Sequence, residues 1–425
     1  MFAALIRTKE SFCLRFWIAI VLSAWLVFSS STTAAQELSS EQLAADLDQF
    51  ATELPEKHIN LFAKLSQSAF EKRVAEIKQG IDGLDRITFA IELSKLLAEV
   101  GDGHTKVAFD PAQFHFFPIN FKSLEDGLFV RAIEKTHREC VKGKVQSIGG
   151  VAAEQLLGKI AVVIPHDNEF ALKSFIDNQL NCAELLSACG CKIEDGTTTI
   201  KIDCAGKVNA IQLTARRPNQ FGSLKWEAAG DSFDSLADKK SRLDHWNDVV
   251  EPGILYFKYN RCRNGEAFER LVNGTAGYVA QNPGKIKTFV VDLRHNGGGD
   301  SRIMAPLIRY LKGNEQLNRK GRLFVITGRQ TFSSAVLNTL ELQEQTNAIL
   351  IGEPPGGRPN HFGEIRSLSL KNSGLKIFYS TKKFVRIADS DPDFLPLDVV
   401  VPLTSKNWFA KEDPFLKAIK EFEVD

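Results

Sequence analysis

The chain has 425 residues, of which 44% are hydrophobic and 25% are charged. This composition is typical of a globular protein and excludes a disordered, collagen-like or coiled-coil chain. Lys and Arg together number 53 and Asp and Glu 52, which leaves a formal net charge of +1. Because this balance supplies no long-range field for phosphates, and we find no local basic patch, nucleic acid is not expected as a partner.

Residues 1–35 have the three-part layout of a secretory signal peptide. Basic residues precede the apolar run 16–28, and a stretch of small residues follows and ends at Ala35. The run is shorter than the ~20 residues that a membrane-spanning helix needs. We therefore expect cleavage near Ala35, export to the periplasm or the cell exterior, and no stable membrane anchor.

Residues 36–116 are predicted to form a small helical domain. Phe89, Leu93 and Leu97 are among apolar residues that recur at spacings of three and four, and the pattern stops at Gly101. A helix that ends on a glycine cap has this signature.

A mostly β domain is predicted next, over residues 117–217. Its short apolar runs are separated by Gly, Asp and Asn, with a helical insertion near 165–190. The polar stretch 218–252 is interpreted as a connector.

Residues 253–425 are predicted to form an α/β domain. Near-continuous apolar runs such as 254–260 and 287–294 are typical of strands buried on both faces of a sheet. The later runs 322–327 and 348–352 flank a segment with helical periodicity. Strand, helix and strand joined by short loops form a βαβ crossover, so the sheet should be largely parallel.

Six cysteines remain after Cys13 leaves with the signal peptide. An even number in an exported protein favours disulfides. We expect at least one among four that lie close together in the sequence, namely Cys182, Cys189, Cys191 and Cys204. A zinc knuckle is the less favoured interpretation, because the C-x-C pair has no second matched pair and no nearby histidine.

Two segments of the α/β domain carry candidate chemistry. The strand in 290–300 ends in three glycines, whose exposed N–H groups suit an oxyanion or a substrate main chain, although a plain tight turn would use the same residues. Ser333 falls where a strand has ended and a helix begins, so free N–H groups point at its hydroxyl. Serine is also a common N-cap, but with Ser334 beside it one can cap while the other is exposed.

His104 is the candidate base for a serine nucleophile. It lies in a Gly-rich turn just past a helix end. A serine needs a base of pKa near 7, and histidine is its usual supplier, although histidines in such loops are often only solvated.

These motifs together resemble a known family. D-L-R-x-N-x-G-G after a strand, T-F-S-S-A opening a helix and A-I-L-I-G-E-P-P-G-G after it are similar to the core of the C-terminal processing (tail-specific) and tricorn-type serine peptidases. The D-G-H-T turn and the closing D-S-D-P-D-F-L-P-L-D fit the tricorn-like branch. The resemblance covers most of residues 50–405. It implies a crotonase-like catalytic domain preceded by a PDZ-like module, to which residues 143–157 are the loosest match.

The resemblance also implies roles for individual residues. It places the nucleophile on Ser333, the base on His104 and the orienting acid on Asp391, with Asp393 and Glu364 as rivals. The oxyanion hole falls on Gly297, Gly298 and Ser334.

Arg358 stands where the processing-peptidase branch has a lysine base. A guanidinium cannot surrender its proton near neutrality, so we expect a Ser–His site and not a Ser–Lys site. His295 and His361 lie next to the site in sequence and, with Arg358, are candidate substrate contacts. His295 is also the alternative base.

The sequence therefore predicts an exported serine peptidase that acts on peptides or proteins without a metal or cofactor. Two alternatives stay open: a peptidase-like scaffold that binds peptides without turnover, and an esterase or amidase that uses the same residues. The sequence does not define the oligomeric state.

Overall fold

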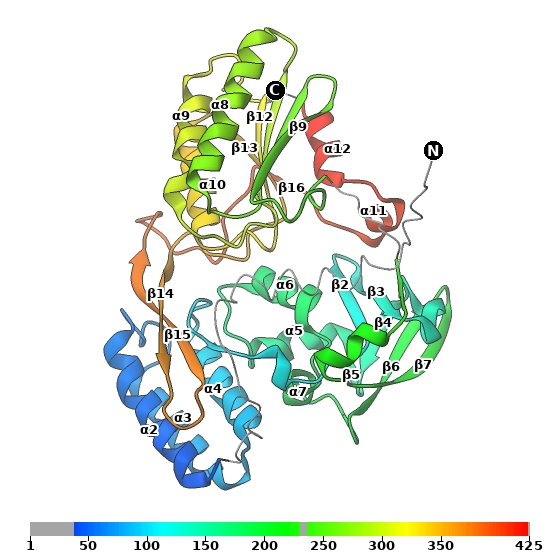
Figure 1. Ribbon diagram of the computed structural model, residues 1–425, viewed down its shortest axis with the longest axis vertical. Helices are drawn as coiled ribbons and strands as arrows, with labels where there is room; N and C mark the ends of the chain where they lie inside the picture. Colours follow the sequence, from blue (N-terminus) through cyan, green and yellow to red (C-terminus); the bar gives the residue numbers. More distant parts are fainter. Residues whose placement is uncertain (1–37, 230–235, 424–425) are drawn as a thin grey trace, which may run out of the picture.

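The computed structural model describes residues 38–229 and 236–423. The predicted signal peptide lies outside these residues. No helix within them is long and apolar enough to cross a bilayer. The chain forms three regions, with the α/β region at one end and the helical and β regions side by side at the other (Figure 1).

The helical region contains the predicted helix and two others. Its helices are α2 (Ser40–Lys57), α3 (Gln67–Gln79) and α4 (Arg86–Val100). The side chain of Asp85 caps the start of α4, and Gly101 ends it in the left-handed conformation with φ of 72°. The expectation for this helix is confirmed.

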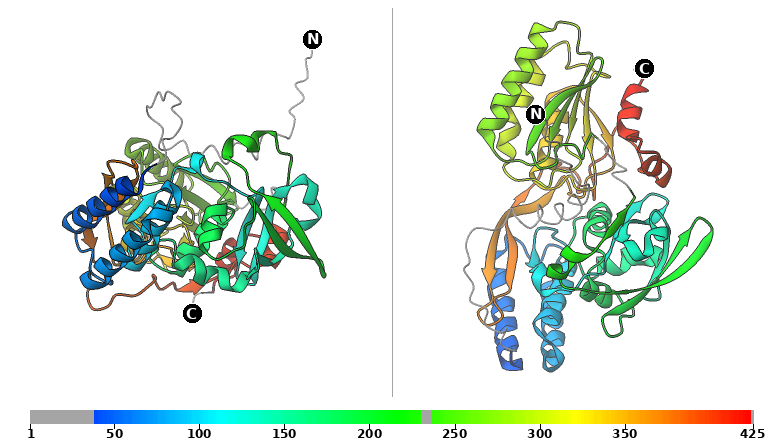
Figure 2. Two further views of the ribbon diagram at one scale, coloured as in Figure 1. Left: turned by 90° about the horizontal axis from the view of Figure 1, so that it is seen from below. Right: turned by 45° about the vertical axis from the view of Figure 1, so that its right-hand side comes forward.

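A hairpin from the far end of the chain completes the core of the helical region (Figures 1 and 2). Its strands are β14 (His361–Ser369) and β15 (Lys376–Phe384), and β15 pairs with β1 (Lys106–Ala108). Leu368 and Ile377 of the hairpin are buried among the helices. The sequence assigns the hairpin to the α/β domain, but its apolar residues fill the helical core, a contact that local periodicity does not reveal.

The β region is an antiparallel sheet with the strand order β2-β3-β4-β6-β7. Two short strands, β5 and β8, pair with β4 and β3. Three helices follow β5 in the chain, and two of them, α6 and α7, are the expected helical insertion. The elements are β2 (Ile119–Leu124), β3 (Gly127–Glu134), β4 (Lys144–Ile148), β5 (Val151–Ala152), α5 (Ala153–Ala161), α6 (Glu169–Gln179), α7 (Ala183–Ala188), β6 (Thr197–Cys204), β7 (Lys207–Thr214) and β8 (Trp226–Ala228).

The α/β region is a six-stranded sheet with the order β16-β13-β12-β11-β10-β9. All neighbours from β10 to β16 are parallel, as predicted, and β9 is an antiparallel edge. The strands are β9 (His245–Glu251), β10 (Ile254–Tyr259), β11 (Thr288–Asp292), β12 (Leu323–Thr327), β13 (Ile349–Gly352) and β16 (Val399–Val400). The helices are α8 (Gly265–Gln281), α9 (Ala305–Gly313), α10 (Ser334–Gln345), α11 (Ser405–Ala410) and α12 (Pro414–Lys420).

Helices cover both faces of this sheet. Side chains of α8, α9 and α10 share one core with the strands, and side chains of α12 pack on the other face. Two segments of the expected connector are strands, since β8 joins the β region and β9 joins the α/β sheet. As an edge strand that buries few of its side chains, β9 resembles a polar linker in sequence.

The six cysteines of the described residues are free thiols in this structure. The expected disulfide therefore stays a prediction.

Candidate active site

Ser333 occupies a strained backbone position at the start of α10. Its φ is 52° and its ψ is −127°, a conformation that costs a non-glycine residue about 1–3 kcal/mol. The hydroxyl makes no capping hydrogen bond to the helix, so Ser333 is not a conventional N-cap. The Ser334 hydroxyl donates to the carbonyl oxygen of Gly299 at 2.6 Å, which ties the start of α10 to the glycine turn.

The glycine turn after β11 lies directly against Ser333. At Gly298, where φ is 104°, an added Cβ would be 2.8 Å from the Ser333 Cβ and 3.1 Å from the Ser334 amide nitrogen. Only glycine permits this approach. The structure thus brings the predicted oxyanion residues Gly298 and Ser334 together beside Ser333, with Gly297 next in the turn.

The backbone amides of the predicted oxyanion hole differ in whether they already donate a hydrogen bond. The Gly298 N–H donates to Asn296 Oδ1 at 2.9 Å. The Ser334 N–H, in the first turn of α10, donates no hydrogen bond within the described residues.

His104 lies against the residue that precedes Ser333. Its ring stacks on Phe332 with the centroids 4.4 Å apart. The side chain is buried, and neither ring nitrogen has a hydrogen-bond partner within the described residues. A buried imidazole with both nitrogens unpaired is costly in a folded protein.

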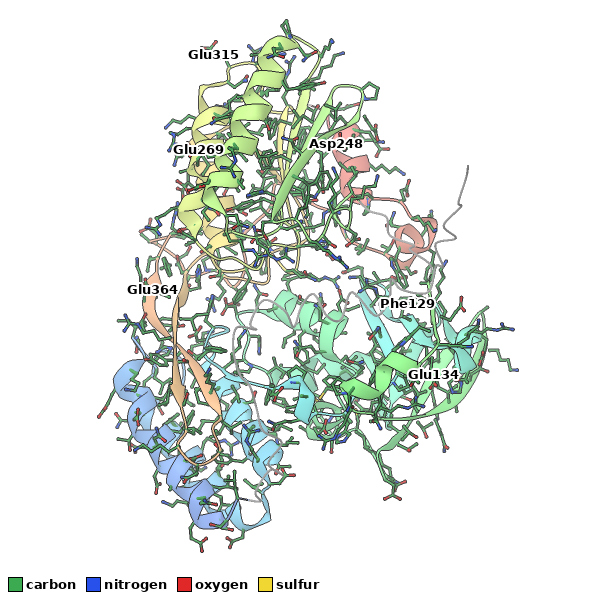
Figure 3. All side chains as sticks on the ribbon, in the orientation of Figure 1. Phe129, Glu134, Asp248, Glu269, Glu315 and Glu364 are labelled. Carbon is green, nitrogen blue, oxygen red and sulfur yellow. The ribbon has the colours of Figure 1, made fainter. Side chains whose placement is uncertain are left out.

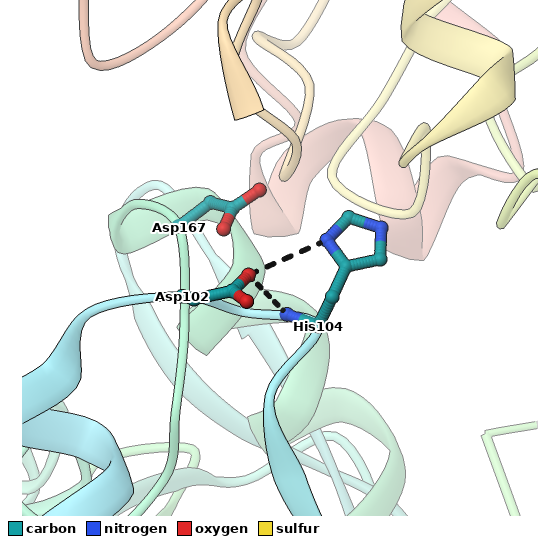
Figure 4. A group of neighbouring side chains, drawn as sticks. All are labelled: Asp102, His104 and Asp167. Atoms are coloured by element: carbon teal, nitrogen blue, oxygen red, sulfur yellow. Dashed lines mark hydrogen bonds and ion pairs between the residues drawn. The ribbon is translucent and has the colours of Figure 1, made fainter. Parts of the chain in front are cut away.

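Two carboxylates flank His104, and the sequence analysis singled out neither. Asp102 Oδ1 is 3.7 Å from His104 Nδ1 and accepts the His104 backbone N–H at 2.9 Å (Figure 4). Asp167, from the loop before α6, accepts the Gly103 N–H at 2.8 Å. One potential ligand atom from each of Asp102, His104 and Asp167 lies within 4.8 Å of the other two.

Asp102 is held by hydrogen bonds from two regions of the chain. Its Oδ2 accepts from His58 Nε2 at 3.1 Å and from the hydroxyls of Thr105 and Ser380, each at 2.6 Å. Burial alone would raise the pKa of this carboxyl, but the bond from His58, the charge of His104 and the two hydroxyls hold the pKa well below its usual range.

Burial lowers the pKa of the His104 imidazole, and the charge of His361 acts in the same direction. The charges of Asp167 and Asp102 oppose the shift without cancelling it. His104 is therefore neutral near pH 7, the state that a general base requires.

None of the three predicted acids forms an ion pair with His104 within the described residues. Asp391 Oδ2 is 3.3 Å from the Arg358 guanidinium and its side chain is 59% exposed, while Asp393 Oδ1 is 3.0 Å from the same group. Glu364 is exposed on β14 (Figure 3). The D-G-H-T turn that revealed His104 also contains Asp102, two residues earlier, and this was the available signal. Asp167 gave none.

Of the other candidate residues, His361 and Arg358 lie at the His104 site, whereas His295 has a different partner. His361 stacks on His104 with the centroids 5.5 Å apart, and its buried Nε2 has no partner. Arg358 is buried and its carbonyl oxygen is 2.9 Å from His361 Nδ1. His295 instead lies 3.8 Å from Asp238, and burial lowers the pKa of its imidazole to about 4.

Comparison with known proteins identifies the fold. No family model and no curated protein matches the chain. The solved structure of mature CPAF in complex with lactacystin is 12% identical, with a TM-score of 0.63 over 90% of this chain and 97% of that chain. The structure of a CPAF mutant is 10% identical, with a TM-score of 0.63 over 91% of this chain and 99% of that chain. The photosystem II D1 C-terminal processing protease is 13% identical over 86% of this chain and 94% of that chain, with a TM-score of 0.41. The chain therefore shares the CPAF fold along most of its length.

Proposed function

We propose that this protein is a serine peptidase that is exported and hydrolyses peptide bonds through Ser333 and His104. One observation carries the proposal: a buried imidazole, kept neutral and without hydrogen-bond partners, packs against the residue before a strained serine. The CPAF-like fold and the resemblance to tail-specific and tricorn-type peptidases support it. On the same basis we assign the α/β region as crotonase-like and the β region as PDZ-like.

The exposure of the two residues suits these roles. Ser333 is half-buried, which leaves part of the residue open to a substrate, whereas a general base acts on the hydroxyl and can be fully buried, as His104 is. The carboxylates face His104 Nδ1, which leaves Nε2 on the other edge of the ring to take the hydroxyl proton. When His104 becomes an imidazolium, Asp102 and Asp167 stabilise the new charge. The same proton then goes to the leaving amine.

Asp102 is our first candidate for the orienting acid, because its Oδ1 faces His104 Nδ1 and its other oxygen is fixed by three donors. The separation of 3.7 Å is longer than a hydrogen bond, as is common before substrate binds. Asp391 remains the alternative from the family resemblance, and it would have to leave Arg358 to take this role.

The oxyanion hole is assigned to the Ser334 amide and the turn at Gly297 and Gly298. The Gly298 N–H becomes available only if its bond to Asn296 Oδ1 opens. This engaged donor is the observation that favours a second function, a peptide-binding scaffold that does not turn over.

A covalent serine probe separates these functions. Mature protein is treated with a fluorophosphonate, and the labelled residue is mapped by mass spectrometry, with Ser333→Ala as the control. Labelling at Ser333 that disappears in His104→Ala supports the peptidase. Peptide binding with no labelling supports the scaffold, and labelled protein that cleaves small esters or amides but no peptide supports an esterase or amidase.

A further inference from the structure

The two carboxylates beside His104 carry more negative charge than their surroundings neutralise. Asp102 and Asp167 are both buried. Asp167 accepts hydrogen bonds from backbone amides, of Gly103 at 2.8 Å and Arg358 at 3.5 Å, and forms no ion pair with a Lys or Arg within the described residues. Lys106 interacts with both carboxylates through its charge but lies outside ion-pair distance. Buried carboxylates in such a setting favour a cation.

The donor set matches a particular class of cation. Imidazole nitrogen and carboxylate oxygen are both donors that Zn²⁺ accepts, and three protein ligands leave the fourth tetrahedral position to a water. Both His104 nitrogens are unpartnered although the side chain is only 2% exposed, so no existing hydrogen bond has to break. The lowered pKa of His104 also favours the neutral form that binds metals.

The spacing suits such an ion after a small contraction. Bonds of about 2.0–2.2 Å in a tetrahedral site place the ligand atoms about 3.3 Å apart. The His104 Nδ1 to Asp102 Oδ1 distance of 3.7 Å is near this value, and the 4.8 Å limit for the whole set means that no pair of ligand atoms has to close by more than about 1.5 Å. Asp167 can supply this closing, because it lies in the loop before α6 rather than within a helix or strand.

We propose that Asp102, His104 and Asp167 bind a divalent transition-metal ion of the Zn²⁺ type and that the bound ion switches off hydrolysis. A neutral imidazole has one proton and one free electron pair on its nitrogens. When the ion takes the pair on Nδ1, the proton is on Nε2, so Nε2 cannot accept the Ser333 proton. Metal binding stands on the cluster alone, while the inhibition rests on the proposed function.

The binding test uses calorimetric titration of Zn²⁺ into the mature chain. We expect one ion per chain, an at least ~10-fold weaker dissociation constant in Asp167→Asn and loss of the site in His104→Ala. Asp167→Asn keeps an oxygen for the Gly103 N–H, so the loop contact is preserved. His115→Ala is the matched control, because His115 Nδ1 and Glu184 Oε1 form another His–carboxylate pair, 2.7 Å apart and more exposed. This variant should bind Zn²⁺ like the wild type.

Cobalt supplies a second measurement. Co²⁺ in this site should give the intense visible absorption of four-coordinate cobalt, and Asp167→Asn should weaken the band. No binding, or equal binding in wild type, Asp167→Asn and His104→Ala, would overturn the metal site.

Ser333→Ala separates the metal site from the peptidase hypothesis. It should bind Zn²⁺ with unchanged affinity, because Ser333 is not a ligand. In active wild type, stoichiometric Zn²⁺ should remove hydrolysis and a chelator should restore it. Binding without inhibition of an active enzyme would refute the switch and, with it, His104 as the base. Binding to a chain that never hydrolyses peptides would leave the metal site standing and refute the peptidase.

Discussion

Two buried charged clusters in this protein differ in how their charges are matched. The sheet cluster, Lys258, Asp292, Arg294 and Asp413, contains two cations and two anions. Lys258 Nζ is 2.9 Å from Asp292 Oδ1, Arg294 Nε is 2.7 Å from Asp292 Oδ2, and Arg294 is 3.0 Å from Asp413. The His104 cluster, Asp102, His104 and Asp167, has two anions beside a neutral ring with unpartnered nitrogens. Buried ion pairs are costly to break one partner at a time, whereas unmatched charges are typical of a site that handles protons or ligands.

The clusters also differ in the way the chain assembles them. The sheet cluster joins neighbouring strands β10 and β11 to α12 within the α/β region. The His104 cluster takes Asp102 and His104 from the turn after α4 and Asp167 from the loop before α6, and it packs against Phe332 of the α/β region. It therefore forms only where all three regions meet.

The sharpest test of the comparison is His104→Ala. We expect kcat to fall by roughly three to six orders of magnitude, as removal of the base does in comparable serine sites. The variant should stay folded with a somewhat lower melting temperature, because the imidazole makes no hydrogen bond that the fold would lose but its stacking on Phe332 is lost. Peptide turnover and thermal unfolding measured on the same preparation check both. A folded variant that keeps more than about a tenth of wild-type kcat would move the base elsewhere, with His295 the next residue to test.

Asp292→Ala, in the sheet cluster, should mainly lower the stability of the fold. It leaves Lys258 and Arg294 facing each other without the shared carboxylate, so the free energy of unfolding should drop by about 3–5 kcal/mol. Urea denaturation measures the drop. Asp167→Asn is the contrasting variant from the His104 cluster, and because it relieves repulsion between carboxylates its free energy of unfolding should stay within about 1 kcal/mol of wild type. Similar losses in the two variants would erase the distinction between the clusters.

The same difference explains which parts of the fold and of the site could be predicted from the sequence. The parallel strands and α4 were predictable, because each carries its signal in consecutive residues. Ser333 and His104 were found through short motifs, and the structure brings their segments together. Asp167 and the packing of the β14–β15 hairpin on the helical region were not predictable, since both depend on contacts between residues far apart in the chain.

The pH profile tests the charge balance around His104. The neutral imidazole is the working form and its pKa is lowered by burial, so kcat/KM should rise with pH through an inflection below the ordinary value of about 6.5. Asp102→Asn removes a charge that raises this pKa, so the inflection should move further down. The matched control is Asp391→Asn, whose carboxylate pairs with Arg358 and should leave the inflection in place. If only Asp391→Asn shifts the profile, Asp391 is the orienting acid and Asp102 is structural.

Arg358→Lys should change activity least. The guanidinium contacts both Asp391 and Asp393, while the contact of Arg358 with the His104 cluster is made by its backbone N–H, 3.5 Å from Asp167 Oδ2. A lysine keeps that backbone contact but cannot hold two carboxylates with a planar fork, so we expect kcat within about tenfold of wild type and no gain. Lysine is also the residue that the processing-peptidase branch uses as its base, so the variant offers the chain a second route to deprotonate Ser333. If steady-state assays show that kcat rises about tenfold or more, and the gain persists in His104→Ala with Arg358→Lys, proton transfer does not depend on the unmatched cluster and the Ser–His assignment fails.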